Sequence, residues 1–200
     1  NTFCWTYNPR PKVTHMNPGG RKVLPFITWP FQDECLGQLE EAYGREDRLI
    51  EKSRDMGASW MILTLFLWRW QFYGRETLAL VSRNENLVDK VGDPDSLFWK
   101  LDFLLEHQPS FLVPRYYRKH LQLENRDNLS VIDGYSTTGD VLAGGRKTAA
   151  MLDEFARFEQ ADGYKALAAT QYATDCRFFN STPQGAQGAF YDMRQKTEVI

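Results

Sequence analysis

Arg48-Leu-Ile-Glu51, Lys52-Ser-Arg-Asp-Met-Gly-Ala-Ser59 and an apolar run that begins at Trp60 follow one another without interruption. The first four residues predict a short strand, and the polar stretch with its glycine predicts a turn. Residues 59–73 are apolar on nearly every face, which predicts a buried helix. The aromatic residues near helical spacing in this run are expected in the core: Trp60, Phe66, Trp68 and Trp70.

The alternation of strand and helix continues along the chain. Further strands are expected at 77–82, 148–152 and 177–180, and the period-2 pattern of 121–124 and 129–132 predicts a hairpin. The helices expected between them span 32–43, 84–91, 95–106, 160–172 and 186–196. This order predicts a three-layer α/β fold, with helices on both faces of a mostly parallel sheet. Ligands bind such sheets at the carboxyl ends of the strands.

The composition argues against several classes of protein. The 200 residues carry 24 basic and 26 acidic side chains, so nucleic acid is not expected to bind mainly through bulk positive charge. The three cysteines are far apart and no histidine stands at ligand spacing, which argues against a disulfide scaffold and a structural zinc site. The apolar stretch 56–68 is too short to span a bilayer and no signal peptide is visible, so we expect a soluble intracellular protein.

The first thirty residues differ from the rest in composition. Residues 1–30 contain five prolines and the pair Gly19-Gly20, and such a segment cannot hold long helices. We therefore expect an extended N-terminal arm at 1–30 and a core domain at 31–200.

Residues 52–59 partly match the phosphate-binding pattern G-x-x-x-x-G-K-[ST]. Gly57 and Ser59 fit this pattern, whereas Lys52 stands at the first glycine and Ala58 at the lysine. A turn that leads into a helix N-terminus directs backbone N–H groups at an anion, and Ser59 can ligate Mg²⁺. A lysine at the other end of the loop could reach the same phosphate oxygens. The alternative at this point is a charged surface turn before a core helix.

Polar residues also follow two later strands. Asp153 and Glu154 follow the strand expected at 148–152, where an aspartate can hold a metal and a glutamate can polarise water. Consecutive strand positions would send their side chains to different sides. The alternative is that they complement the dipole of the next helix. Residues 181–185, Ser-Thr-Pro-Gln-Gly, offer hydroxyls at the end of another strand, or only a helix cap followed by proline.

Taken together, these motifs resemble those of one protein family. K-S-R-x-x-G-x-S-W at 52–60, M-L-D-E-F-A at 151–156 and N-S-T-P-Q-G-A-x-G-A-F-Y at 180–191 are similar to the deviant Walker A, Walker B and coupling motifs of the large terminase subunit. This subunit is the ATP-driven motor that packs DNA into the capsids of tailed phages. Residues 24–32 resemble the adenine-side segment of the family, and the resemblance extends over about 24–193. It implies a P-loop NTPase of the additional-strand, RecA/helicase-like type.

The resemblance implies a role for each motif residue. Lys52 would contact the β- and γ-phosphates of ATP, Arg54 would act on the γ-phosphate within the same chain, and Glu154 would be the general base. Ser59 and Asp153 would hold Mg²⁺. The residues implied to contact the nucleotide are Gln32, Lys52, Ser53, Arg54, Met56, Gly57, Ala58, Ser59 and Trp60. Ser181 and Thr182 would couple hydrolysis to motion. In Gly144-Gly145-Arg146-Lys147, Arg146 is the best candidate for an arginine that acts across subunits, although a charged turn explains this stretch equally well.

The resemblance also implies partners. ATP hydrolysis would drive double-stranded DNA into a procapsid in the host cell cytoplasm, with the portal protein, the small terminase subunit and a ring of identical chains as partners. The isolated chain is expected to be mostly monomeric. The chain has no room for the nuclease domain of the family, so nuclease activity is not expected. The stretch 115–119, Arg-Tyr-Tyr-Arg-Lys, could grip DNA phosphates, but a solvated loop is the favoured interpretation.

Two other functions are weighed against this one. A different nucleic-acid translocase or helicase is disfavoured by the displaced Lys52 and by the S-T-P-x-G turn. A degenerate nucleotide-binding scaffold is favoured by the loss of the usual lysine, but Ser59, Asp153 and Glu154 together disfavour it.

Overall fold

Parallel strands form the centre of the structure, a computed structural model that describes residues 4–14, 17–137, 142 and 145–200. Seven strands form one sheet in the order β3-β9-β8-β4-β7-β6-β5. Those that run parallel are β3 (Arg48–Glu51), β9 (Arg177–Ser181), β8 (Ala149–Asp153), β4 (Thr77–Ser82) and β7 (Val131–Ser136). The antiparallel strands β6 (Gln122–Asn125) and β5 (Tyr116–Lys119) extend the sheet at one edge. The predicted mostly parallel sheet is confirmed.

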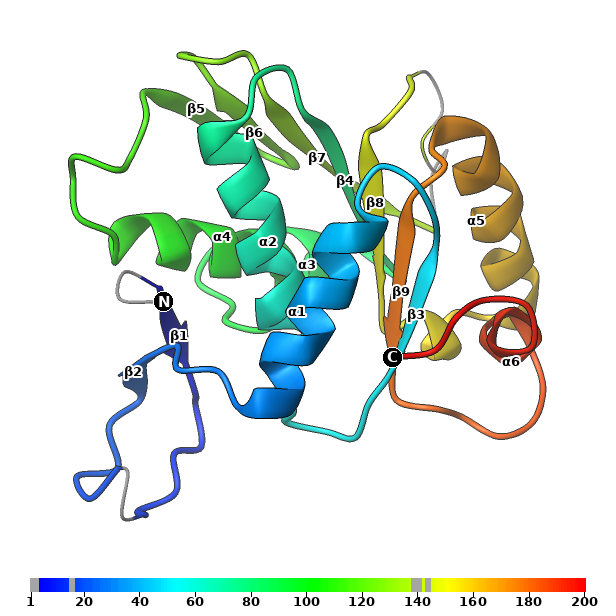
Figure 1. Cartoon of the computed structure of the whole chain (residues 1–200), viewed down its shortest axis with the longest axis horizontal. Helices are drawn as coiled ribbons and strands as arrows, with labels where there is room; N and C mark the ends of the chain where they lie inside the picture. Colours follow the sequence, from blue (N-terminus) through cyan, green and yellow to red (C-terminus); the bar gives the residue numbers. More distant parts are fainter. Residues whose placement is uncertain (1–3, 15–16, 138–141, 143–144) are drawn as a thin grey trace.

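Helices cover both faces of this sheet (Figure 1). One face carries α1 (Pro30–Ala42), α2 (Ala58–Phe72), α3 (Glu85–Val88) and α4 (Leu97–Glu106). The other face carries the short 3₁₀ helix η1 (Phe155–Arg157), α5 (Gln160–Ala173) and α6 (Ala189–Arg194). Side chains of β4 alternate between the two layers, because Leu80 belongs to the core under α2 whereas Ala79 and Val81 belong to the core under α5. The predicted three layers are therefore present.

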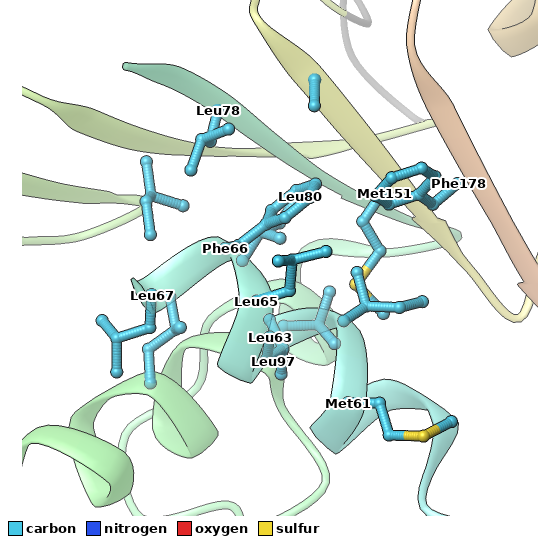
Figure 2. Packing of buried hydrophobic residues seen from close by; sticks show 14 of the residues in the cluster. Met61, Leu63, Leu65, Phe66, Leu67, Leu78, Leu80, Leu97, Met151 and Phe178 are labelled. Carbon is cyan, nitrogen blue, oxygen red and sulfur yellow. The ribbon is translucent and has the colours of Figure 1, made fainter. Parts of the chain in front are cut away.

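The helix α2 is buried on most of its surface, as its sequence predicts. Figure 2 shows Phe66 of this helix beside residues of the sheet, and its ring centroid lies 5.9 Å from that of Phe178 in β9. Phe66 and Trp70 are fully enclosed, whereas Trp60 and Trp68 are only partly buried at the margin of the core. Full burial of an apolar side chain contributes ~1.5–3 kcal/mol. The packing therefore fixes the N-terminus of α2 relative to the ends of β3 and β8.

The sheet contains one strand that the sequence does not predict. Residues 116–119, expected in a solvated loop, form β5 and pair with β6. The guanidinium of Arg118 lies over the ring of Phe98 and pairs with Asp89 (2.7 Å) and Asp102 (3.0 Å). These tertiary ion pairs stabilise a strand whose charged sequence indicated a loop. The predicted hairpin is present as β6 and β7, which begin and end one to four residues later than expected.

Three helices are shorter than predicted, and one of them, expected at 95–106, begins only two residues later, at Leu97. The helix expected at 84–91 ends at Val88, because Asp89 leaves the helix to accept a hydrogen bond from Leu121 N–H (2.6 Å) and to pair with Arg118. The helix expected at 186–196 covers only 189–194. It begins after Gly188, whose φ of +91° lies outside the helical region.

In residues 4–14 and 17–29 the N-terminal segment contains no helix, as its prolines predict, whereas α1 begins at Pro30, the last residue expected in the arm. The strands β1 (Trp5–Tyr7) and β2 (Val23–Pro25) pair antiparallel. The ring of Tyr7 packs on α4 against Trp99 (5.3 Å between centroids) and Phe103 (6.0 Å). Within the described part of the chain, the helices are too short or too polar to cross a membrane.

Candidate active site

The carboxyl ends of three strands lie side by side, because β3, β9 and β8 are neighbours and run parallel. Their register places Glu51 opposite Ser181, and Asn180 opposite Asp153. The stretches that follow these strands lie together at the lower edge of the sheet in Figure 1, although up to about 130 residues separate them along the chain. The strand β9 lies between the strand that enters the loop 52–57 and the strand that ends at Asp153. This is the additional-strand arrangement that the resemblance implies.

The loop 52–57 is fixed at both of its ends. The N–H of Lys52 donates to the carbonyl oxygen of Ser181 (3.1 Å), which ties the start of the loop to β9. Gly57 ends the loop as the N-cap of α2, and its φ of +75° favours glycine at this position. The first N–H groups of a helix have no intrahelical partner and lie at the positive end of its dipole. A loop in this position is suited to hold an anion.

Ser59, Asp153 and Asn180 form a hydrogen-bonded triangle beside the loop. The hydroxyl of Ser59 donates to Asp153 Oδ1 (2.9 Å), and Asn180 Nδ2 donates to the same oxygen (2.6 Å) and to Ser59 Oγ (3.1 Å). Burial raises the pKa of Asp153, while the Lys100 ammonium and the two hydrogen bonds act in the opposite direction. The triangle joins α2, β8 and β9 at a single point.

The oxygen atoms of this triangle fit a Mg²⁺ ion. Mg²⁺ prefers oxygen ligands and usually binds one or two protein groups together with water and phosphate. Ser59 offers a hydroxyl and Asp153 a carboxylate. The Oδ1 atom of Asn180 is buried without a hydrogen-bond partner, so it can accept a bond from a water on the ion. In the described ranges, no group of three or more His, Cys, Asp or Glu side chains could hold a metal by itself.

Glu154 follows β8 directly and has a cation on each side. Lys52 Nζ donates to its Oε1 (2.8 Å), and Arg157 Nε lies 3.2 Å from its Oε2. Glu154 has φ 53° and ψ 39°, a left-handed conformation that costs ~1–3 kcal/mol in a residue other than glycine. The expectation that strand alternation separates Asp153 from Glu154 is therefore wrong. Glu154 lies outside the strand, and a sharp backbone turn gives the two carboxylates different partners.

Ser181 connects the loop 52–57 with the turn that carries Glu154. Its hydroxyl accepts a hydrogen bond from the N–H of Ala156 (3.1 Å), two residues after Glu154, and donates to the carbonyl oxygen of Thr182 (3.2 Å). Its own carbonyl oxygen accepts a hydrogen bond from the N–H of Lys52 (3.1 Å). The Oγ1 atom of Thr182 is buried without a partner. A shift at the end of β9 would thus reach the loop and the turn that carries Glu154.

A cavity of about 430 Å³ adjoins the loop. Its wall includes Phe31, Glu34 and Gln38 of α1, Met56 of the loop, and Ile200. Residues 198–200 run beside β3, where the N–H of Ile200 donates to the carbonyl oxygen of Leu49 (2.9 Å). The cavity is mostly apolar and opens next to Lys52 and Ser53, so it can accept a flat apolar group attached to an anion.

The structure does not bring together all of the predicted residues. Arg54 is exposed on the loop. Arg146 precedes β8 and therefore lies at the amino ends of the parallel strands. The length of β8, about 16 Å, separates it from Asp153. This arginine is exposed and does not reach the site of its own chain. Gly144, from the same predicted stretch, lies outside the described residues.

The basic and aromatic stretch 115–119 is largely neutralised. Arg118 is paired with Asp89 and Asp102, as described above. Arg115 Nε lies 2.7 Å from Asp127 Oδ1. These ion pairs do not favour a DNA-binding surface on β5.

Three residues of the site were missed in the sequence. Asn180 was assigned to a strand and to the start of the coupling motif without a role of its own, Arg157 only to the segment after a motif, and Lys100 only to a helix. Lys100 donates to the carbonyl oxygen of Asp95 (2.8 Å); burial lowers its pKa, and the charge of Asp153 opposes this shift. A polar residue at the end of an apolar strand is the one signal that could have identified Asn180.

The strand order and the helices on both faces of the sheet are those of a P-loop NTPase fold with an additional strand. No protein-family model matches the sequence, and no curated protein sequence matches it. Solved structures of phage large terminases do share the fold. The HK97 bacteriophage large terminase superimposes with a TM-score of 0.67 at 11% identity, over 88% of this chain and 39% of the terminase.

Two further structures give the same result. The large terminase ATPase domain of Thermus phage P74-26, solved as an arginine-to-alanine mutant, has a TM-score of 0.60 at 17% identity, over 84% of this chain and 69% of that domain. The large terminase of a thermophilic bacteriophage in complex with ADP has a TM-score of 0.60 at 12% identity, over 86% of this chain and 44% of its own. The chain therefore has the fold of a large terminase ATPase domain, and it spans about two-fifths of the length of the HK97 terminase and of the terminase with ADP.

Proposed function

We propose that this chain is the ATPase domain of a phage large terminase, in which Mg²⁺-dependent ATP hydrolysis drives double-stranded DNA into a procapsid. One observation carries the proposal. Lys52 contacts Glu154, and Ser59 contacts Asp153, across about 100 residues of sequence and at one edge of a terminase-like sheet. A charged surface turn before a core helix would not require either contact. The solved terminase with ADP supports a nucleotide as the ligand.

In this proposal some residues of the chain bind the phosphates and others act on the attacking water. The loop N–H groups, Lys52 and Arg54 bind phosphate oxygens, and positioned cations stabilise the loose transition state of phosphoryl transfer. Mg²⁺, held by Ser59 and Asp153, would neutralise charge on the β- and γ-phosphates. Glu154 would accept the proton of the attacking water. The cavity beside α1 would hold the base.

The ion pair between Lys52 and Glu154 links the proposed phosphate-binding cation to the proposed base. As long as Lys52 Nζ is hydrogen-bonded to Glu154, the lysine occupies the carboxylate oxygen that would otherwise orient water. A bound phosphate competes with Glu154 for the lysine. Nucleotide binding would therefore release the general base, with Arg157 as its remaining partner.

The finer parts of the proposal concern partners. The resemblance supports double-stranded DNA, the portal protein and the small terminase subunit as partners, a ring as the assembled form and the host cytoplasm as the compartment. The exposed Arg146 would act on the site of a neighbouring subunit. Ser181 and Thr182 would transmit hydrolysis to moving elements. Light scattering of the isolated chain should show a monomer.

Phosphate release by the purified chain tests the central claim. We expect slow, Mg²⁺-dependent release of phosphate from ATP that stops when EDTA removes the ion. Stimulation by double-stranded rather than single-stranded DNA would distinguish a packaging motor from a helicase. Binding of ATP without any phosphate release would contradict the proposal and support the degenerate scaffold, which the alanine at position 58 favours.

Asn180→Ala should weaken Mg²⁺ binding at the site. The substitution removes the hydrogen bonds to Asp153 and Ser59, and loss of such an outer partner typically costs ~10–100-fold in metal affinity. The affinity for Mn²⁺ in the presence of ADP, measured by electron paramagnetic resonance, reports this loss directly. Asn128→Ala is a poor control because that side chain caps α2. Asn86→Ala, at an exposed position of α3, is a better one. An unchanged Mn²⁺ affinity in Asn180→Ala would remove Asn180 from the site.

A further inference from the structure

Gln32 is buried at the start of α1, and both ends of its amide are in use. Its Oε1 accepts a hydrogen bond from the N–H of Trp29 (2.9 Å), which caps the helix. Its Nε2 donates to the carbonyl oxygen of Met56 in the phosphate loop (2.9 Å). Only 5% of the residue is exposed. The side chain therefore joins the first turn of α1 to the loop.

Gly57 lies close to the same amide nitrogen. A Cβ atom at Gly57 would lie 3.0 Å from Gln32 Nε2, which is closer than ordinary packing allows. Gly57 has φ +75° and begins α2. The amide of Gln32 thus packs on the turn that sets the direction of the first N–H groups of α2. Movement of Gln32 would move the phosphate-binding end of the loop.

Other residues of α1 face the cavity beside the loop. Phe31, Glu34 and Gln38 line this cavity, and Gln32 is not part of the lining. Glu34 is exposed, Gln38 is partly exposed, and Gln38 Nε2 donates to Glu34 Oε1 (3.5 Å), so the two side chains present a polar pair at the wall of the cavity. A glutamate and a glutamine one helical turn apart can accept and donate hydrogen bonds at the edge of a base.

We propose that Gln32 is a positioning residue for the phosphate loop and does not read the base, and that Glu34 and Gln38 discriminate between bases. The inference rests on the proposed nucleotide-binding function. It gives Gln32 a role different from the nucleotide contact that the sequence resemblance implies. Without the Gln32 amide, the carbonyl oxygen of Met56 loses its partner and the loop loses its tie to α1. Binding of the phosphates should then weaken by about 10-fold, whatever base is attached.

Tripolyphosphate, which has no base, separates the two roles. We would measure the affinities of the full chain for tripolyphosphate, ATP and GTP by calorimetry in buffer that contains Mg²⁺. Gln32→Ala should weaken all three by a similar factor and leave the ratio of ATP to GTP affinity unchanged. Gln38→Ala should change that ratio and leave tripolyphosphate binding as in the wild type. Gln171→Ala, at an exposed position of α5, is the matched control.

A second variant keeps the test valid if Gln32→Ala folds poorly. Gln32→Glu keeps the oxygen that caps Trp29 N–H but replaces the donor that faces Met56, so it should show the same loss for tripolyphosphate. Loss of ATP affinity with normal tripolyphosphate affinity would overturn the inference, because it would make Gln32 a base reader. If the wild type bound neither tripolyphosphate nor ATP, the proposed function would fail as well. Normal binding of all three ligands by both Gln32 variants would overturn the inference alone.

Discussion

Glu154→Gln is expected to lower the rate of ATP hydrolysis by ~10²–10⁴-fold while ATP still binds. Glutamine keeps the shape of the side chain but cannot accept the proton of the attacking water. The affinity for ATP should not fall, because Glu154 contacts Lys52 and Arg157 in the structure. Removal of its charge frees Lys52 for the phosphates. Calorimetric ATP binding and single-turnover hydrolysis, measured side by side, test both parts.

The controls for this experiment come from the same region. Glu159→Gln changes an exposed carboxylate at the start of α5, and its hydrolysis rate should match the wild type. Asp153→Asn should behave differently from Glu154→Gln, because it also weakens Mg²⁺-dependent affinity. Near-normal hydrolysis by Glu154→Gln would assign the base to another residue.

The sequence was sufficient to predict the sheet because its central strands are apolar on both faces. Ala149–Leu152 and Leu78–Val81 are fully buried between two layers of helices, so apolar side chains are required at these positions. The polar residues directly after such strands are then visible as interruptions. This is why the loop and the pair Asp153 and Glu154 could each be placed at the end of a strand from the sequence.

The sequence was insufficient where tertiary contacts decide the outcome. β5 depends on Arg118 and its pairing with Asp89 and Asp102, which come from other elements. The left-handed conformation of Glu154 has no local signal, because neither glycine nor asparagine marks the turn. The resemblance implies a nucleotide contact for Gln32, and the sequence carries no signal for the two hydrogen bonds that its amide makes with the backbone of Trp29 and Met56.

Lys52→Ala is expected to weaken ATP binding by ~10–100-fold, because a hydrogen bond from a charged donor is worth ~1.5–3 kcal/mol. Turnover should fall further, by another ~10²–10³-fold, if the same ammonium stabilises the charge of the transition state. The side chain is only 12% exposed and lies 2.8 Å from Glu154, so its amine is already held beside the predicted phosphate site. Calorimetry and phosphate release measure the two losses separately.

Lys165→Ala is the matched control for Lys52→Ala, since this lysine is exposed on α5 and its nearest carboxylate, Asp162, is 3.9 Å away. It should bind and hydrolyse ATP like the wild type. If Lys52→Ala also behaved like the wild type, the displaced lysine would have no role with the phosphates, and Arg54 would be left as the only predicted cation of the loop. A loss of turnover with normal ATP affinity would instead mean that Lys52 acts only through Glu154. The ion pair between these two residues makes that outcome distinct, because removal of the lysine leaves Glu154 with Arg157 as its cationic partner.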